Sequence, residues 1–255
     1  MRVLPWTYLV VAFSFIYLPV SALVLFSFQD GTLPVPPFDG PSTRWYREVL
    51  GDDNLVDALL NSLLVAGLSS TVSVILGFTA AYGLARHVLP GSLLIRSLLI
   101  APITVSYLIV GLGLLIMVQN LGLGVSLWTV GVGHVVINLP LCFAILYASM
   151  GAQQENAERA ARDLGASEAQ VVWLITVPML APALLAGFFL SVTLSWDEFI
   201  IAFLLSRFDV TLPVEIWSLL RSGLSPRLNA VGSFVFLVSI TAVMLVEMFV
   251  LRKRQ

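Results

Sequence analysis

The sequence predicts an all-α protein that crosses a membrane several times. Hydrophobic residues make up 58% of the 255 residues, charged residues only 11%, and the mean hydropathy is +0.97. These values lie far above those of an ordinary soluble domain. A segment that spans a hydrocarbon core must satisfy its own backbone polar groups, and a helix does so. We therefore expect a single transmembrane domain over residues 1–255.

Apolar segments long enough to cross a core of about 30 Å recur along the chain. Six such segments are candidate spanning helices, at about 6–28, 57–84, 93–117, 127–149, 180–205 and 229–251. The second contains small residues such as Ser70, Ser73 and Gly77, which favour close packing of helices within a bilayer. Pro140, inside the fourth, does not argue against a helix there.

The distribution of basic residues predicts that both termini are cytoplasmic. In that orientation eight of the 13 basic residues lie inside and five outside, which agrees with the positive-inside rule. The inside set is Arg2, Arg86, Arg96, Arg159, Arg162, Arg252, Lys253 and Arg254. The connection between the fourth and fifth spans is then also cytoplasmic.

That connection, residues 155–178, is the longest charged interruption of the apolar pattern, and it predicts two short helices joined by a turn. Helix formers extend from Asn156 to Leu164, and Gly165 suits a left-handed helix end. Ser167, followed by three helix formers, is typical of the N-cap of a second helix. Two helices exposed between spans would form a docking surface for a soluble partner.

Sequence signals of catalysis are missing from this chain. Lys253 is the only lysine, so a Gly-rich phosphate loop that ends in Gly-Lys-Ser/Thr cannot form. His87 and His134 stand apart, Cys142 is the only cysteine, and no His/Cys cluster has the spacing of metal ligands. No Gly-x-Ser-x-Gly elbow occurs. We expect no enzyme activity, no metal and no cofactor in this chain.

Segment 155–178 resembles the cytoplasmic coupling loop of permease subunits in bacterial ABC importers. The pattern of such loops runs Glu-Ala-Ala, three residues, Gly, nine residues, Ile-x-Leu-Pro, and the residues in register here are Ala160, Ala161, Gly165, Ile175 and Pro178. Val177 stands where Leu is usual, and Arg159 where Glu is usual, with Glu158 just before it. The resemblance implies that the residues coupling this chain to an ATPase are Glu158, Arg159, Ala160, Ala161, Asp163, Gly165, Ile175 and Pro178.

Further motifs extend the resemblance over most of the chain. They are Thr43-Arg-Trp-Tyr, Asp163-Leu-Gly-Ala-Ser, Thr193-Leu-Ser-Trp-Asp-Glu, Leu212-Pro-Val-Glu-Ile-Trp-Ser and Ser225-Pro-Arg-Leu-Asn-Ala. They are similar to the second permease subunit of spermidine/putrescine importers. The resemblance implies a six-span type I importer permease in the bacterial inner membrane. It also implies a homologous second permease, two ATPase subunits that bind ATP and Mg²⁺, an extracytoplasmic substrate-binding protein, and no nucleic-acid partner.

Two acids in the fifth span are candidate cargo contacts. Asp197 and Glu198 follow Trp196 within an apolar segment, where a charged residue costs about 2.5–3.5 kcal/mol on insertion scales. Such residues usually face a bundle interior or a wet cavity. Adjacent helical positions point about 100° apart. We therefore expect Asp197 to face the pathway and Glu198 a neighbouring helix or subunit. The reverse assignment and a purely structural pair are the alternatives.

A departure in the third span bears on the cargo. Ser106 and Tyr107 stand where polyamine permeases tend to carry Pro followed by an acid. A phenol ring retains a cation–π attraction of roughly 0.5–2 kcal/mol but not the charge of a carboxylate. We expect a small organic cation such as a polyamine of the spermidine/putrescine kind. This departure indicates fewer positive charges than spermidine carries, as in a diamine, a monocation or a zwitterion, and a monocationic or zwitterionic, amino-acid-like cargo is the alternative. Interhelical packing is the other interpretation of Tyr107.

Two other classes are compatible with an apolar helical chain. A secondary transporter or channel would need inverted repeats or paired broken helices, and neither is visible in the sequence. An intramembrane enzyme would need catalytic residues assembled from distant positions. The match to the coupling loop favours the importer permease over both.

Overall fold

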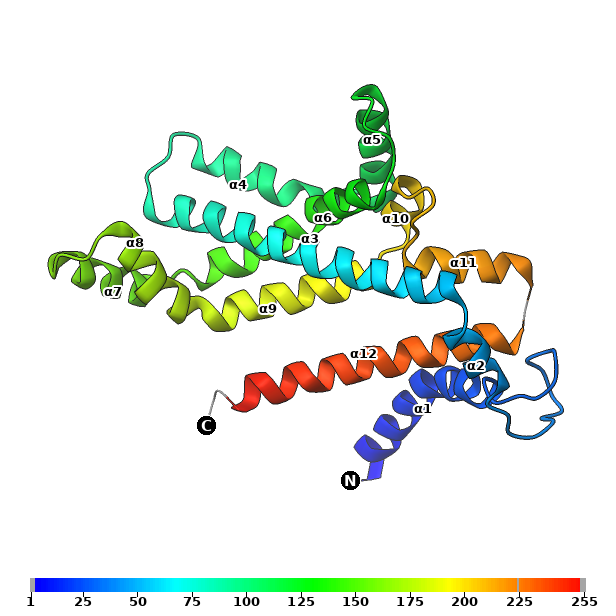
Figure 1. The fold of residues 1–255 in the computed structure, drawn as a ribbon. Coiled ribbons are helices and arrows are strands. Elements are labelled where there is room, and N and C mark those ends of the chain that lie inside the picture. The colour runs from blue at the N-terminus through cyan, green and yellow to red at the C-terminus, as the bar shows by residue number, and fades with distance from the viewer. Residues whose placement is uncertain (1–2, 224, 253–255) are drawn as a thin grey trace. The chain divides into compact units, whose positions relative to one another are not determined.

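The computed structural model describes residues 3–223 and 225–252. Their backbone is helical, with turns between the helices and one isolated β-bridge between Gln29 and Pro41. Figure 1 shows the elements, which are α1 (Val3–Phe26), α2 (Arg44–Leu50), α3 (Asp53–Arg86), α4 (Ser92–Ile100), the 3₁₀ turn η1 (Ala101–Thr104), α5 (Tyr107–Asn120), α6 (Leu127–Ser149), α7 (Ala152–Asp163), α8 (Glu168–Val171), the π-helical turn η2 (Val172–Thr176), α9 (Val177–Trp196), α10 (Ile200–Leu205), α11 (Leu212–Ser222) and α12 (Pro226–Arg252). The all-α prediction is confirmed for the described residues.

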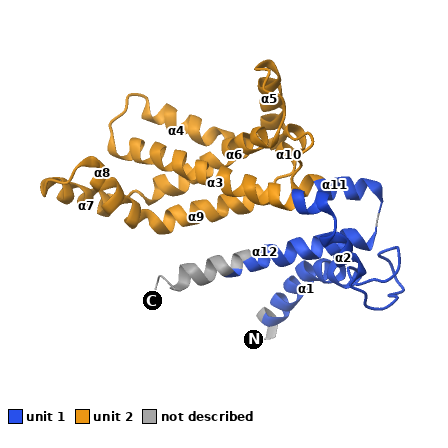
Figure 2. Cartoon of the chain, viewed as in Figure 1, with its two compact units in different colours: residues 1–57, 215–255 blue, residues 58–214 orange. Residues whose placement is uncertain are grey.

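The chain forms two compact units. The first combines residues 1–57 with 215–255, and the second contains residues 58–214 (Figure 2). In the first unit, α12 packs against α1 and α2. There the indole of Trp45 donates a hydrogen bond to the backbone carbonyl of Gln29 at 2.7 Å, and Arg227 forms an ion pair with Asp52. These contacts tie the connection between α1 and α2 to the start of α12.

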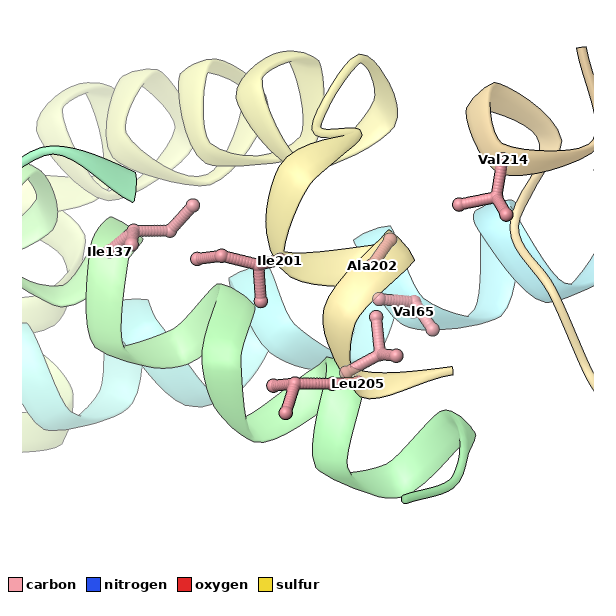
Figure 3. Packing of buried hydrophobic residues seen from close by; sticks show 7 residues of the cluster. Val65, Ile137, Ile201, Ala202, Leu205 and Val214 are labelled. Atoms are coloured by element: carbon pink, nitrogen blue, oxygen red, sulfur yellow. The ribbon is translucent and has the colours of Figure 1, made fainter. Parts of the chain in front are cut away.

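The second unit is built around the long helices α3, α6 and α9 (Figure 1). Gly77 lets α3 approach α6 closely, because a Cβ atom there would lie 2.9 Å from the backbone nitrogen of Phe143. At one end, α10 lies against α5 and α6. The buried apolar cluster that surrounds α10 comprises Val65, Val130, Ile137, Ile201, Ala202, Leu205 and Val214 (Figure 3). At the other end, α7 and α8 follow one another.

The number of spanning helices agrees only in part with the six expected. Within the described residues, four helices are long and apolar enough to cross a membrane, and a bent pair raises the number to five. The sixth predicted span, 229–251, falls in α12, of which Pro226–Thr241 qualifies only as a shorter apolar helix. Arg2, Lys253 and Arg254, predicted to be cytoplasmic, lie outside the described residues. Six spans therefore remain a prediction.

Two predicted spans are interrupted. In the third, the helical segments Ser92–Thr104 and Tyr107–Asn120 meet at 106°, since Val105 and Ser106 both adopt extended ψ angles of 136°. In the fifth, α9 ends at Trp196 and α10 begins at Ile200. The expectation that both acids of this span lie within a helix is therefore wrong. The physical reason is that a side chain in the break, described below, caps α10.

Candidate functional site

The charged connection folds as two helices around a glycine turn. Gly165 has φ +86°, and its N–H donates to the carbonyl of Arg162 at 2.9 Å, while Ala166 N–H donates to that of Ala161 at 3.0 Å. This pair of bonds defines a Schellman end of α7. Ser167 caps α8 through a bond from Gln170 N–H to its hydroxyl. The left-handed stop and the N-cap predicted from the sequence are both confirmed.

Glu158 anchors this loop to the rest of the second unit. Its side chain is fully buried. One oxygen accepts from Arg86 Nε at 2.7 Å, and the other from Arg86 Nη2 at 3.3 Å and from Thr176 Oγ1 at 2.9 Å. Arg86 ends α3 and Thr176 lies in η2, so one carboxylate joins three elements. A buried carboxylate with this many donors is satisfied.

The neighbouring basic residues face outward. Arg159 is exposed and forms an ion pair with Glu155, one turn earlier in α7. Arg162 Nε and Nη2 donate to the two oxygens of Glu168 at 2.7 and 2.9 Å, and Nη2 also lies 3.3 Å from the hydroxyl of Tyr82. The bidentate contact with Glu168 raises the pKa of Arg162 above its ordinary value. This pair braces α7 against α8 across the glycine turn.

The outer surface of the loop is apolar and hollowed. Leu164 is 90% exposed, and Trp173 and Leu174 are also exposed. A hollow of about 280 Å³ beside the turn is lined by Ala161, Leu164, Gly165, Ala166, Gln170, Leu174 and Ile175. A second hollow, of about 680 Å³, is lined mainly by polar and charged residues, Arg159 and Arg162 among them. Asp163 and Pro178 are exposed as well. Exposed large apolar side chains beside a cavity are typical of a protein interaction surface.

In the fifth span, the two predicted acids have different environments. Glu198 is 5% exposed. Its carboxylate accepts from Ile201 N–H, 3.0 Å from each oxygen, and from Ala202 N–H at 3.1 Å. It therefore caps the first turn of α10. Asp197 is exposed, and among the described residues no hydrogen bond or ion pair engages its carboxylate.

The aromatic candidates lie at the ends of helices. Trp196 is the last residue of α9 and is half-buried. Tyr107 is the first residue of α5, at the bend of the third span, and is 37% exposed. Trp196 directly precedes Asp197 in the sequence. No hydrogen bond joins Tyr107 to either acid in the described part of the chain. Both candidate positions for cargo contact are places where a span is interrupted.

Sequence reasoning missed the partners of these residues. The sequence marked Arg86 only as one of the basic residues that predict the membrane orientation, and it did not single out Thr176. His134, interpreted as an isolated histidine, lies with its Nε2 3.4 Å from Glu198 Oε2. The only signal in the sequence was the rarity of polar groups in apolar segments, which marks each residue as notable without identifying its partner.

Interrupted apolar helices, a buried acid at one break and a braced loop between two spans are typical of membrane transport proteins. The chain is a member of the family of binding-protein-dependent transport system inner membrane components, whose model matches residues 73–255. It is thus a permease subunit of the ABC importer class, and the family resemblance drawn from the sequence is confirmed.

Curated relatives and solved structures agree with this assignment. The chain is 33% identical to the putrescine transport system permease protein PotI of Escherichia coli K12, over 91% of this chain and 85% of the relative. It is 27% identical to the spermidine/putrescine transport system permease protein PotC of the same organism, over 95% and 92%. A bacterial alginate ABC transporter in complex with an alginate-bound periplasmic protein has a similar fold, with a TM-score of 0.73 and 15% identity over 96% and 91%.

Proposed function

We propose that this chain forms half of the translocation pathway of an ATP-driven importer for a small organic cation, a diamine such as putrescine. The observation that carries the choice of cargo is Asp197, an exposed acid that directly follows Trp196 at a break in an apolar helix. A carboxylate attracts an ammonium group, and an indole face adds a cation–π contribution. The similarity to a putrescine permease supports the same cargo.

The assembly that we propose is a heterodimer with a homologous permease, carried on two ATPase subunits that bind ATP and Mg²⁺ and served by an extracytoplasmic binding protein. In this arrangement the chain crosses a bacterial inner membrane six times, and both termini and α7–α8 lie on its cytoplasmic side. The apolar surface around Leu164, Trp173 and Leu174 supports docking of an ATPase there.

The coupling role divides among the residues named from the sequence. Gly165 forms the turn, and Ala160, Ala161, Asp163, Ile175 and Pro178 belong to or flank the surface that we propose the ATPase contacts. Glu158 acts from inside, because it is buried against Arg86. Arg159, in the position usual for Glu, points outward with Glu155. Force applied to α7 would therefore reach α3 and α9 through the Glu158 carboxylate.

Tyr107 favours a second candidate cargo. The phenol at the bend of the third span carries no charge to hold a second ammonium group, which suits a monocationic or zwitterionic, amino-acid-like amine. We rank the diamine first, because Asp197 supplies one charged contact and the partner permease can supply another.

Uptake by the reconstituted complex tests the cargo. The chain is purified with its partner permease, ATPase and binding protein, and placed in vesicles with internal ATP. We expect the vesicles to take up radiolabelled putrescine. An excess of unlabelled putrescine should suppress this uptake, and the same concentration of glutamine should not. Uptake of a zwitterionic amino acid with no putrescine uptake would replace the first candidate with the second. A cargo-dependent transporter made of this chain alone would overturn the proposed assembly.

A further inference from the structure

The second unit contains a buried histidine that the proposed pathway does not use. His134 lies in α6 and is fully buried. Its Nδ1 is 2.6 Å from Ser195 Oγ, and its Nε2 is 3.4 Å from Glu198 Oε2. Ser195 Oγ is in turn 3.3 Å from Ser69 Oγ. A polar chain therefore runs from α3 through α9 and α6 to the break before α10.

The chemistry of the carboxylate fixes the direction of this chain. An ionised carboxylate only accepts hydrogen bonds, so we assign a ring proton to the nitrogen that faces Glu198. In the neutral ring, Nδ1 then accepts from the hydroxyl of Ser195, which can accept from Ser69. The ring nitrogen Nε2 makes no hydrogen bond within the described residues, so its approach to Glu198 at 3.4 Å is an electrostatic contact with the carboxylate.

The surroundings of Glu198 indicate the role of the His134 ring. The backbone N–H groups of Ile201 and Ala202 hold the carboxylate, and apolar side chains of the cluster in Figure 3 surround α10. A ring nitrogen close to the carboxylate adds to these bonds in offsetting the cost of burying its charge. His134 approaches from α6, a different helix, and so ties the cap of α10 to the neighbouring span.

We propose that His134 is a positioning residue for the translocation pathway: it holds the Glu198 carboxylate as the cap of α10 and thereby sets the break that presents Asp197. The inference rests on the proposed function for the role of Asp197, but the contact with Glu198 does not depend on the cargo. His134 acts through Glu198 and touches no cargo.

The substitutions His134→Gln and His134→Asn distinguish the contacts of the two ring nitrogens. Glutamine places its amide nitrogen near the position of Nε2 and can still donate to Glu198, whereas asparagine reaches only the Nδ1 side and Ser195. Cys142→Ala is the matched control, because Cys142 is also fully buried on α6 and bonds to Gly187 rather than to the break.

The first measurement needs no cargo. Hydrogen exchange of the Ile201 and Ala202 amides is followed by mass spectrometry in the purified complex. Loss of the cap should speed their exchange, by about tenfold in His134→Asn, because the contact between Nε2 and the carboxylate that holds these amides is removed. His134→Gln and Cys142→Ala should remain within about twofold of wild type.

The second measurement is putrescine uptake per ATP hydrolysed in vesicles. His134→Asn should lower this ratio, and the double variant with Glu198→Gln should be no worse than Glu198→Gln alone, since residues that act through one contact are not additive. Wild-type exchange in His134→Asn would overturn the proposal, and so would equal losses in His134→Asn and His134→Gln. Failure of wild-type putrescine uptake would contradict the proposed cargo alone, because the exchange result would still stand.

Discussion

The carboxylate of Glu158 and the guanidinium of Arg86 form a buried ion pair with hydrogen bonds of 2.7 and 3.3 Å. The two residues are 72 positions apart and join the charged loop to the end of α3. Thr176, the residue before α9, donates a hydrogen bond to the same carboxylate. One carboxylate therefore joins the loop both to α3 and to the start of α9.

Removing Arg86 should loosen this loop. In Arg86→Ala the Glu158 carboxylate is left without a counter-charge, and breaking a buried pair in this way costs about 3–5 kcal/mol. Thermal unfolding in detergent should show the loss, and binding-protein-stimulated ATPase activity should fall with it. Arg159→Ala is the control for thermal unfolding only, because its exposed pair with Glu155 contributes about 0.3–0.5 kcal/mol to stability. Equal effects of the two variants would contradict a special role for the buried pair.

The Gly165 turn should tolerate asparagine better than valine. A Cβ atom at Gly165 meets nothing within 4 Å, so the φ angle of +86° is the only obstacle. Asparagine adopts left-handed conformations far more readily than β-branched residues. We expect Gly165→Val to abolish the coupling of ATP hydrolysis to uptake and Gly165→Asn to retain most of it. If Gly165→Val couples normally, the turn does not contribute to coupling.

Glycine at position 133 is required by α10. A Cβ atom there would lie 2.4 Å from Ile201 Cγ2 and 3.1 Å from Leu205 Cδ1, whereas at Gly131 of the same helix it meets nothing within 4 Å. Overpacking of this kind costs about 1–3 kcal/mol. Gly133→Ala should therefore unfold at a lower temperature than wild type, and Gly131→Ala should not. An unchanged melting temperature in Gly133→Ala would show that α10 can shift freely.

The two acids of the break should respond differently to neutralisation. Asp197→Asn keeps the shape of the side chain and removes its charge, and loss of a charge-assisted contact of about 1.5–3 kcal/mol lowers putrescine uptake about 10- to 150-fold. Asp209→Asn, at another exposed acid of the second unit, should transport like wild type. Uptake is measured at a fixed binding-protein concentration.

Glu198→Gln and Tyr107→Phe complete this series. Glu198→Gln should lower the melting temperature as well as uptake, because the carboxylate is a buried cap. Tyr107→Phe keeps the ring face and should reduce uptake little. Wild-type uptake in both acid variants would remove the main support for a cationic cargo.

Local features of this fold were predictable from the sequence. The composition and the length of the apolar segments indicated helices, since the hydrophobic effect and the backbone's need for hydrogen bonds act on each segment separately. The Gly165 stop and the Ser167 cap were equally local, because each depends on the preferences of one residue and its near neighbours.

Tertiary structure alone decided which polar groups meet. Nothing in the sequence pairs Arg86 with Glu158 or His134 with Glu198, because such contacts depend on how helices distant in the chain pack. The break at residues 197–199 was missed for the same reason: periodicity and hydropathy predict a continuous span. The Glu198 carboxylate instead bonds to the backbone of α10, where His134 of another helix stabilises it. Hydropathy thus determined which segments are helical, and burial of charge determined where one of them is interrupted.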